Sequence, residues 1–335
     1  MRVYGGDLMK VVLENELRLI KGASKLVTKS FVAKLQTEFP DIEFIEVSEL
    51  VDILEACVDA EIYFGWPESK VFSSPNKLKW VHCPGAGINE LSKIPKLVDS
   101  DIVVTNAKGP HVSPMANHVF LFILSLAHKM FSQFEDQQKQ IWDTAKYSGS
   151  LTDLEGQSIG IFGFGDIGKA VAKRALSFGM RVIAVDAYPK KDSSLPVEVM
   201  GFEGFDIMFK ESDWLVITAP YTEKSRGVIG KSELNKMKKS ANIIIISRGG
   251  IVEESALYDS LKEGKLAGAA FDAFEKEPLD KNSPFWKLPN VIISPHVSAE
   301  VPGLYAGRQN VFINNLKKYI NNEPLINICN KKEGF

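Results

Sequence analysis

Residues 158–180 read SIGIFGFGDIGKAVAKRALSFGM, and this stretch decides the fold of the second half of the chain. The apolar run SIGIF is typical of a buried strand. A glycine-rich turn follows it, with Gly163, Gly165 and Gly168 in GxGxxG spacing. Residues 169–178 then repeat apolar side chains at helical spacing. Strand, glycine-rich turn and helix in this order predict a nucleotide-binding βαβ unit.

The three glycines have separate physical tasks in such a turn. The first permits the tight bend, the second lets the backbone approach a pyrophosphate, and the third lets helix and strand pack closely. Phosphate oxygens would accept hydrogen bonds from the unpaired N–H groups of the helix. We count Asp166 and Ile167, which complete the turn, among the cofactor-binding candidates.

Asp186 stands at the end of the next apolar run, RVIAV. A carboxylate there can accept hydrogen bonds from the hydroxyls of an adenosine ribose and would repel a 2'-phosphate, which favours NAD over NADP. Lys190 and Lys191 follow closely and would soften that repulsion, so the degree of NADP tolerance stays open. A strand-end turn residue is the alternative interpretation of Asp186.

Composition excludes several classes of protein. The 335 residues are 45% hydrophobic and 24% charged, which excludes disorder, collagen and coiled coil and leaves room for two domains. A net charge of -2 provides no cationic field for nucleic acid or an anionic membrane, so we expect a small-molecule partner. The three cysteines have neither metal-site nor disulfide spacing, which predicts no metal and favours the cytoplasm. The longest apolar stretch, 119–127, is far shorter than the roughly 20 residues of a membrane span.

Short apolar runs alternate with helical stretches through both halves of the chain. This alternation predicts an α/β fold of two doubly wound parallel-sheet domains. We expect strands at 43–47, 60–65, 78–83, 101–106, 158–162, 181–185, 214–220, 241–247, 267–274 and 291–295. Before residue 43 the pattern predicts no clear order. A long helix beginning near Pro114 links the halves, and a helix over 311–320 is expected to return to the first domain.

Three candidate catalytic residues follow strands of the second half. Arg248 directly follows ANIIIIS, Glu277 comes after AGAAFDAF, and His296 directly follows VIISP. Hydride transfer to a carbonyl requires a cation for the substrate, a proton donor and a group that supports the donor. Any one of these residues at a strand end is more often solvated or capping, so the inference depends on the ordered set behind a dinucleotide turn.

The stretches ISRGGIVEESAL, AGAAFDAFEKEP and VIISPHVSAE resemble the arginine, aspartate–glutamate and histidine signatures of the D-isomer-specific 2-hydroxyacid dehydrogenase family. The resemblance covers about 62–302. It implies a Rossmann NAD-binding domain at 109–299, inserted into a flavodoxin-like substrate domain made of 1–108 and 300–335.

The resemblance also implies a role for each residue. Arg248 would bind the substrate's carboxylate and carbonyl, because its planar donors match them and are always charged. His296 would protonate the carbonyl oxygen, and Glu277 would stabilise the imidazolium. Asp272 would lie near the nicotinamide carboxamide. Further cofactor contacts are expected at Pro220, Ile246 and Ser247.

In the first half, HCPGAGINEL resembles the loop with which the family presents N–H groups to the substrate carboxylate. Gly85, Ala86 and Gly87 are therefore substrate-binding candidates, and an ordinary strand-to-helix turn is the alternative. Trp66, in YFGWPES, lies where the family lines its substrate pocket and is large and flat. It would narrow the pocket or contact an aromatic substrate, or it serves packing alone.

Together these features predict an NAD-dependent D-2-hydroxyacid dehydrogenase that transfers hydride reversibly between NADH and a small 2-oxo acid such as glyoxylate, hydroxypyruvate or pyruvate. Formate dehydrogenase shares the architecture but has a glutamine where this chain has Glu277, and the acid argues against it. An NAD(H)-sensing interaction protein of corepressor type stays open. The resemblance further implies a homodimer through 119–142, and we assign His118, in PMANH, a structural role.

Overall fold

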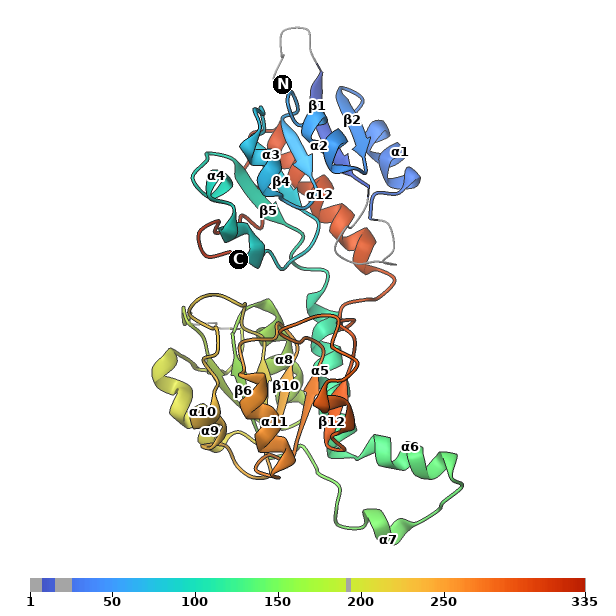
Figure 1. Cartoon of the computed structure of the whole chain (residues 1–335), viewed down its shortest axis with the longest axis vertical. Helices are drawn as coiled ribbons and strands as arrows, with labels where there is room; N and C mark the ends of the chain where they lie inside the picture. Colours follow the sequence, from blue (N-terminus) through green and yellow to red (C-terminus); the bar gives the residue numbers. More distant parts are fainter. Residues whose placement is uncertain (1–7, 16–25, 191–193, 335) are drawn as a thin grey trace. The chain divides into compact units, whose positions relative to one another are not determined.

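The computed structural model describes residues 8–15, 26–190 and 194–334. Lys191 therefore lies outside the described residues. The chain divides into two compact units, one formed by Met1–His111 with Val301–Phe335 and the other by Val112–Glu300. Figure 1 labels many of their helices and strands. Both units are built on a parallel sheet, which confirms the predicted fold class.

The first unit contains a five-stranded sheet in the order β2-β1-β3-β4-β5, which is the flavodoxin-like order. Its strands are β1 (Met9–Glu14), β2 (Ile42–Val47), β3 (Ile62–Phe64), β4 (Trp80–Cys83) and β5 (Val103–Asn106). Its helices are α1 (Lys29–Glu38), α2 (Leu50–Ala56), α3 (Ser69–Ser73), η1 (Asn89–Lys93), α4 (Pro95–Val98) and α12 (Leu304–Ile320). Strand β1 and helix α1 lie before residue 43, where the sequence predicted no clear order.

Helix α12 packs on the sheet of this first unit. It begins at Leu304, earlier than the predicted 311, and buries Phe312 among the side chains of β1, β3 and β4. The Phe312 and Trp80 rings stack with their centroids 5.6 Å apart. The C-terminal segment then forms an antiparallel bridge to β5 through Ile328 and Thr105. The last part of the chain thus completes the core of the first unit.

The second unit contains a seven-stranded parallel sheet in the order β12-β11-β10-β9-β6-β7-β8. Its strands are β6 (Ser158–Phe162), β7 (Arg181–Val185), β8 (Val199–Met200), β9 (Trp214–Ile217), β10 (Asn242–Ile245), β11 (Gly268–Phe271) and β12 (Val291–Ile293). Its helices are α5 (Val112–Ala127), α6 (Met130–Gln138), α7 (Thr144–Tyr147), α8 (Asp166–Ser177), η2 (Phe202–Gly204), α9 (Phe205–Glu211), α10 (Lys231–Leu234), α11 (Glu254–Lys262) and η3 (Pro284–Lys287).

The winding direction of this sheet reverses between β6 and β9, which are neighbours. Open α/β sheets bind ligands at the carboxyl ends of the strands beside such a switch point. Two apolar clusters form the core of the unit, and each includes residues of the central strands. The continuous apolar runs of the sequence are explained by this burial on both faces.

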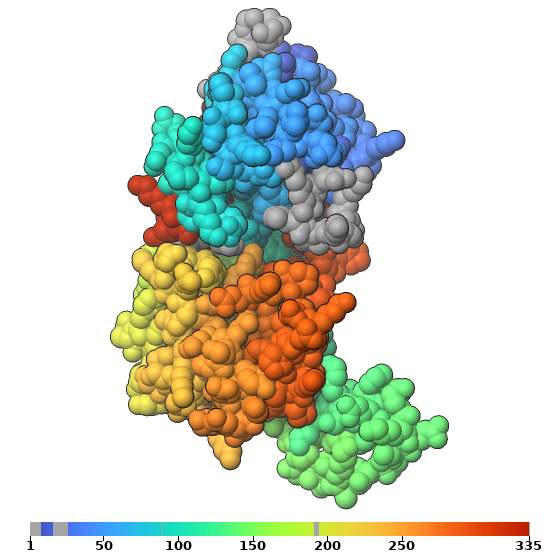
Figure 2. Space-filling view, in the orientation of Figure 1, coloured from blue at the N-terminus to red at the C-terminus, as the bar shows by residue number. Residues whose placement is uncertain are grey.

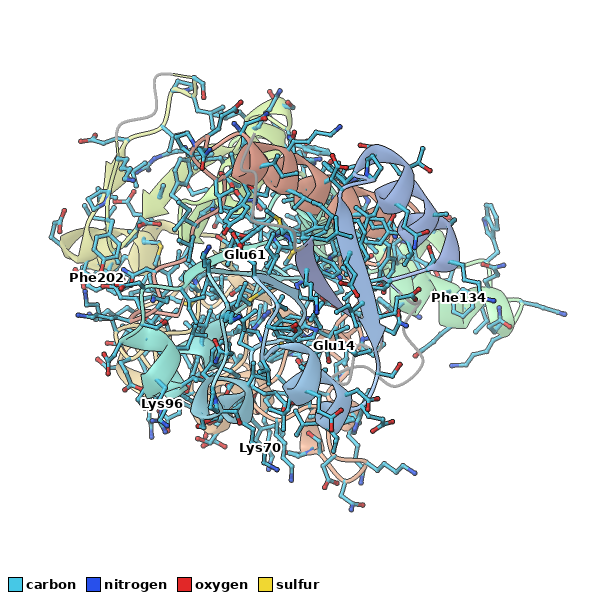
Figure 3. The ribbon with its side chains drawn as sticks, turned by 90° about the horizontal axis from the view of Figure 1, so that it is seen from above. Glu14, Glu61, Lys70, Lys96, Phe134 and Phe202 are labelled. Atoms are coloured by element: carbon cyan, nitrogen blue, oxygen red, sulfur yellow. The ribbon has the colours of Figure 1, made fainter. Side chains whose placement is uncertain are left out.

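Residues 130–147, which include α6 and α7, form an arm that extends from the second unit (Figures 1 and 2). Asp136 stabilises the arm from within, because its carboxylate accepts hydrogen bonds from Lys146 Nζ at 2.7 Å and from the Tyr147 hydroxyl at 2.6 Å. Phe134, labelled on the arm in Figure 3, is 57% exposed, and Trp142 is 94% exposed. Among the described residues, no helix combines the length and apolar character that crossing a membrane requires.

Candidate active site

The glycine-rich turn between β6 and α8 has the geometry that a dinucleotide requires. Gly163 has φ 97°, and a Cβ there would lie 2.3 Å from the backbone nitrogen of Ala219. A Cβ on Gly168 would lie 2.2 Å from the Gly163 carbonyl oxygen, so helix and strand pack too closely for any other residue. A Cβ on Gly165 would meet nothing within 4 Å, which leaves the start of the helix open to a ligand. The turn therefore fits a bound pyrophosphate.

Asp186 is held beside this turn. Its Oδ2 accepts a hydrogen bond from the Phe164 N–H at 2.6 Å, and its Oδ1 accepts one from the Tyr188 N–H at 2.8 Å. Each carboxylate oxygen has more than one acceptor site, so these two bonds orient the group and leave it able to accept ribose hydroxyls.

The other cofactor candidates follow β9 and β10. Pro220 is exposed, Ile246 is fully buried, and Ser247 is 7% exposed. The Ser247 hydroxyl is buried and has no hydrogen-bond partner in the described part of the chain. A buried hydroxyl without a partner is uncommon in proteins, which is consistent with a ligand group as its partner.

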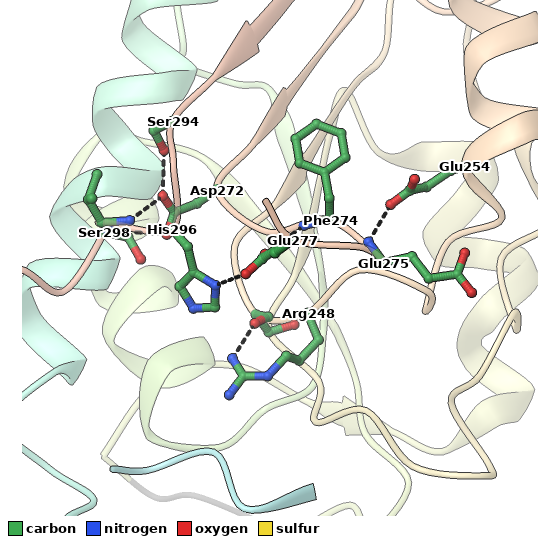
Figure 4. Close-up of polar contacts among 11 residues, drawn as sticks. Arg248, Glu254, Asp272, Phe274, Glu275, Glu277, Ser294, His296 and Ser298 are labelled. Atoms are coloured by element: carbon green, nitrogen blue, oxygen red, sulfur yellow. Dashed lines mark hydrogen bonds and ion pairs between the residues drawn. The ribbon is translucent and has the colours of Figure 1, made fainter. Parts of the chain in front are cut away.

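Arg248, Glu277 and His296 come together after β10, β11 and β12 (Figure 4). His296 Nδ1 lies 2.8 Å from Glu277 Oε2, and Glu277 Oε1 accepts the Phe274 N–H at 2.9 Å. This pairing through Nδ1 directs the other ring nitrogen, Nε2, away from the carboxylate. Nε2 is therefore the atom that can exchange a proton with a ligand.

The charges of these groups support one another. Burial alone would raise the pKa of Glu277, but the hydrogen bond and charge of His296, the Phe274 N–H and the Arg248 charge together lower it. Burial lowers the pKa of the Arg248 guanidinium, and the charge of Glu277 opposes that change. Arg248 Nη1 donates to the Ser247 carbonyl at 2.7 Å, which fixes part of the guanidinium. At neutral pH the site thus contains a fixed cation and a fixed carboxylate.

Asp272 supports the segment that carries His296. Its side chain is 1% exposed, and Oδ1 accepts hydrogen bonds from the Ser294 hydroxyl at 2.5 Å and the Val297 N–H at 2.9 Å. Oδ2 accepts the Ser298 N–H at 3.0 Å. These partners lie on both sides of His296, which has the left-handed φ of 53°. The expected contact between Asp272 and a nicotinamide carboxamide stays a prediction.

His118 extends this network to helix α5. Its Nε2 lies 3.1 Å from Ser294 Oγ. Because Ser294 donates its single hydroxyl hydrogen to Asp272, His118 must carry its hydrogen on Nε2 and donate it to Ser294. Burial lowers the pKa of His118, although the charge of Asp272 opposes this. Ser294 was not among the residues predicted from the sequence, where its only signal was its place two residues before His296.

In the first unit, Trp66 lies against Gly85, where a Cβ would come within 2.4 Å of the indole ring. The indole Nε1 is buried and has no hydrogen-bond partner within residues 8–15, 26–190 and 194–334. Glu14 Oε2 accepts the Trp66 N–H at 2.9 Å and fixes this loop, a role that the sequence did not suggest. Ala86 accepts a hydrogen bond from Asn106 through its carbonyl at 2.9 Å, and Gly87 is exposed.

The sequence pattern of the D-isomer specific 2-hydroxyacid dehydrogenase NAD binding domain matches residues 120–298. Glyoxylate reductase from Korarchaeum cryptofilum is 33% identical over 254 residues, which cover 75% of this chain and 73% of that protein. D-3-phosphoglycerate dehydrogenase from Methanocaldococcus jannaschii is 30% identical over 301 residues and 89% of this chain. The match spans only 57% of the length of that protein. The match with the D-3-phosphoglycerate dehydrogenase from Archaeoglobus fulgidus spans 43% of the length of that protein.

The architecture is also found in solved structures. A D-isomer specific 2-hydroxyacid dehydrogenase family protein from Aeromonas salmonicida has a TM-score of 0.80 and 25% identity, covering 97% of this chain and 100% of that one. The family pattern matches more than half of the chain and includes the glycine-rich turn, Arg248, Glu277 and His296. The chain therefore belongs to the D-isomer-specific 2-hydroxyacid dehydrogenase family.

Proposed function

We propose that this protein catalyses the reversible reduction of a small 2-oxo acid to the D-2-hydroxy acid with NADH. The observation that carries the proposal is the His296–Glu277 pair, joined at 2.8 Å beside Arg248 on the sheet that bears the glycine-rich turn. An imidazole supported by a carboxylate can give a proton to a carbonyl oxygen and take it back in the reverse direction.

Each residue has a defined task in the proposed reaction. The glycine-rich turn and Asp186 would hold NADH, which when bound would supply the hydride for the carbonyl carbon. Arg248 holds the substrate's carboxylate and polarises its carbonyl, since its guanidinium is charged at any physiological pH. His296 Nε2 donates a proton to the carbonyl oxygen, and Glu277 stabilises the imidazolium from which that proton comes. Asp186 favours NAD over NADP, because its carboxylate would repel a 2'-phosphate.

We assign cofactor binding to the unit formed by Val112–Glu300, which also supplies Arg248, and the remaining substrate contacts to the other unit. Gly85, Ala86 and Gly87 would present backbone N–H groups to the substrate carboxylate, and Trp66 would line the substrate pocket. The indole Nε1 of Trp66 is buried without a hydrogen-bond partner among the described residues, which supports a polar ligand there. Glyoxylate and hydroxypyruvate are the first substrates to test, because relatives 33% and 32% identical are named glyoxylate reductase and hydroxypyruvate reductase.

We further propose that the protein is a homodimer. The arm exposes Met130, Phe131, Phe134, Ile141 and Trp142, each at least 48% exposed in the single chain. So many exposed apolar side chains on one segment are typical of a protein interface. The three cysteines are free thiols, which favours a reducing compartment such as the cytoplasm.

The proposal is tested by following NADH absorbance after adding glyoxylate, hydroxypyruvate, pyruvate or phenylpyruvate, with NADPH in parallel. We expect turnover with at least one of them and a preference for NADH. Absence of turnover with every acid, together with tight NADH binding, would contradict the proposal and favour an NAD(H)-sensing protein.

A further inference from the structure

Two backbone segments meet directly behind the proposed catalytic residues. One is the segment that follows Arg248, and the other runs from Phe274 to Glu277. A Cβ on Gly249 would lie 2.0 Å from the backbone nitrogen of Glu275, so the two backbones are in contact there. The position of Glu277 relative to Arg248 therefore depends on how these segments are held together.

Glu254 joins the two segments through a side chain. It is the first residue of α11, and its Oε1 accepts the Glu275 N–H at 2.6 Å (Figure 4). The neighbouring N–H, that of Phe274, donates to Glu277 Oε1 at 2.9 Å. Consecutive amides of one short segment thus bind Glu254 on one side and Glu277 on the other. Glu277 in turn holds His296.

The surroundings of Glu254 disfavour its charge. Burial raises the pKa of Glu254, and the charges of Glu275 and Glu277 raise it further, while the hydrogen bond from Glu275 lowers it. Arg226, Glu253 and Glu275 line the same hollow as Glu254. A favourable acid at the start of α11 is already available in Glu253, which is exposed. Helix stability alone therefore does not explain a second, half-buried carboxylate.

We propose that Glu254 is a positioning residue for the hydride and proton transfer, because its carboxylate anchors segment 274–277 against the Arg248 segment and so fixes the Glu277–His296 pair. This inference rests on the proposed function. Glu254 influences the Glu277–His296 pair in two ways: through its hydrogen bond to the Glu275 amide and through its charge.

The test compares Glu254→Ala, Glu254→Gln and the control Glu253→Ala in the full-length protein. Glu254→Ala removes the acceptor, and we expect kcat to fall about tenfold, because small displacements of reacting groups reduce rates strongly. NADH affinity should stay within about twofold of wild type. Glu254→Gln keeps an oxygen acceptor and should recover most of kcat. Glu253→Ala should behave as wild type.

The pH profile separates positioning from a general loss of stability. Charge interactions are mutual, so removing the Glu254 charge makes Glu277 easier to ionise. The acid limb of kcat/KM should therefore move to lower pH in Glu254→Gln, a change that a purely structural role does not produce.

Two results would overturn the inference. One is a Glu254→Ala enzyme with the kcat of Glu253→Ala. The other, which decides the matter if Glu254→Ala does not fold, is a folded Glu254→Gln enzyme whose pH profile coincides with that of wild type. Wild-type protein inactive on every 2-oxo acid would instead overturn the proposed function, and this inference with it.

Discussion

Replacing Glu277 by Gln removes the carboxylate that pairs with His296 and changes little else in the volume of the site. The Phe274 N–H requires an oxygen at the Oε1 position, so the amide nitrogen of Gln must face His296 Nδ1. That nitrogen is a donor, and it can pair with a neutral imidazole but not with an imidazolium. The substitution therefore disfavours the protonated histidine that the reduction needs.

The magnitude follows from the geometry of the pair. A hydrogen bond between charged partners contributes about 1.5–3 kcal/mol. The His296 and Glu277 side chains are 42% and 37% exposed, so solvent screening places the loss near the lower end, at about 1.5 kcal/mol. This corresponds to roughly tenfold in kcat/KM for reduction near neutral pH.

The assay is the pH dependence of kcat/KM in both directions. In reduction, the deficit of Glu277→Gln should shrink at acidic pH, because the wild-type Glu277, whose pKa is lowered by the hydrogen bond and charge of His296, also loses its negative charge there. In oxidation of the hydroxy acid, which needs neutral imidazole, the loss at neutral pH should be smaller. An equal loss at every pH and in both directions would refute the role given to Glu277.

Further substitutions test other parts of the account. Ser294→Ala breaks the link between His118 and Asp272, and we expect about 1 kcal/mol lower unfolding free energy in denaturant titrations and a reduced kcat. Gly163→Ala places a Cβ against backbone at a φ of 97°, so fluorescence titration should show a loss of NADH binding. Asp186→Ser removes the repulsion of a 2'-phosphate, and kcat/KM with NADPH should rise relative to NADH. Phe134→Asp places a charge on the apolar arm, and sedimentation should show a monomer where wild type gives a dimer.

The sequence was most informative where one local pattern determines the structure. The runs that became β6, β9 and β10 are mostly apolar because helices cover both faces of the sheet. Strand β1 was missed because its apolar core, Val11–Leu13, is too short to separate from its charged neighbours by period. Strand β8 was not predicted either, because two residues are too few to show a strand periodicity.

In the candidate site, too, local motifs predicted some residues, while contacts that depend on the folded backbone were not predicted. The resemblance gave Arg248, Glu277 and His296 from their motifs, and the structure places them together. The sequence did not reveal that Asp272 accepts hydrogen bonds from both sides of His296, because these depend on the left-handed turn at that residue. Glu254 was not singled out either, since acids in a first helical turn are common and its partner is a backbone amide.

The most direct test of the account is the rate of NADH oxidation by the His296→Gln variant with the best 2-oxo acid, measured together with its NADH affinity. If His296 is the proton donor, the rate should fall by about a thousandfold while NADH affinity stays close to that of wild type. A variant that retains most of the wild-type rate, or that loses rate and NADH affinity together, would contradict the assignment.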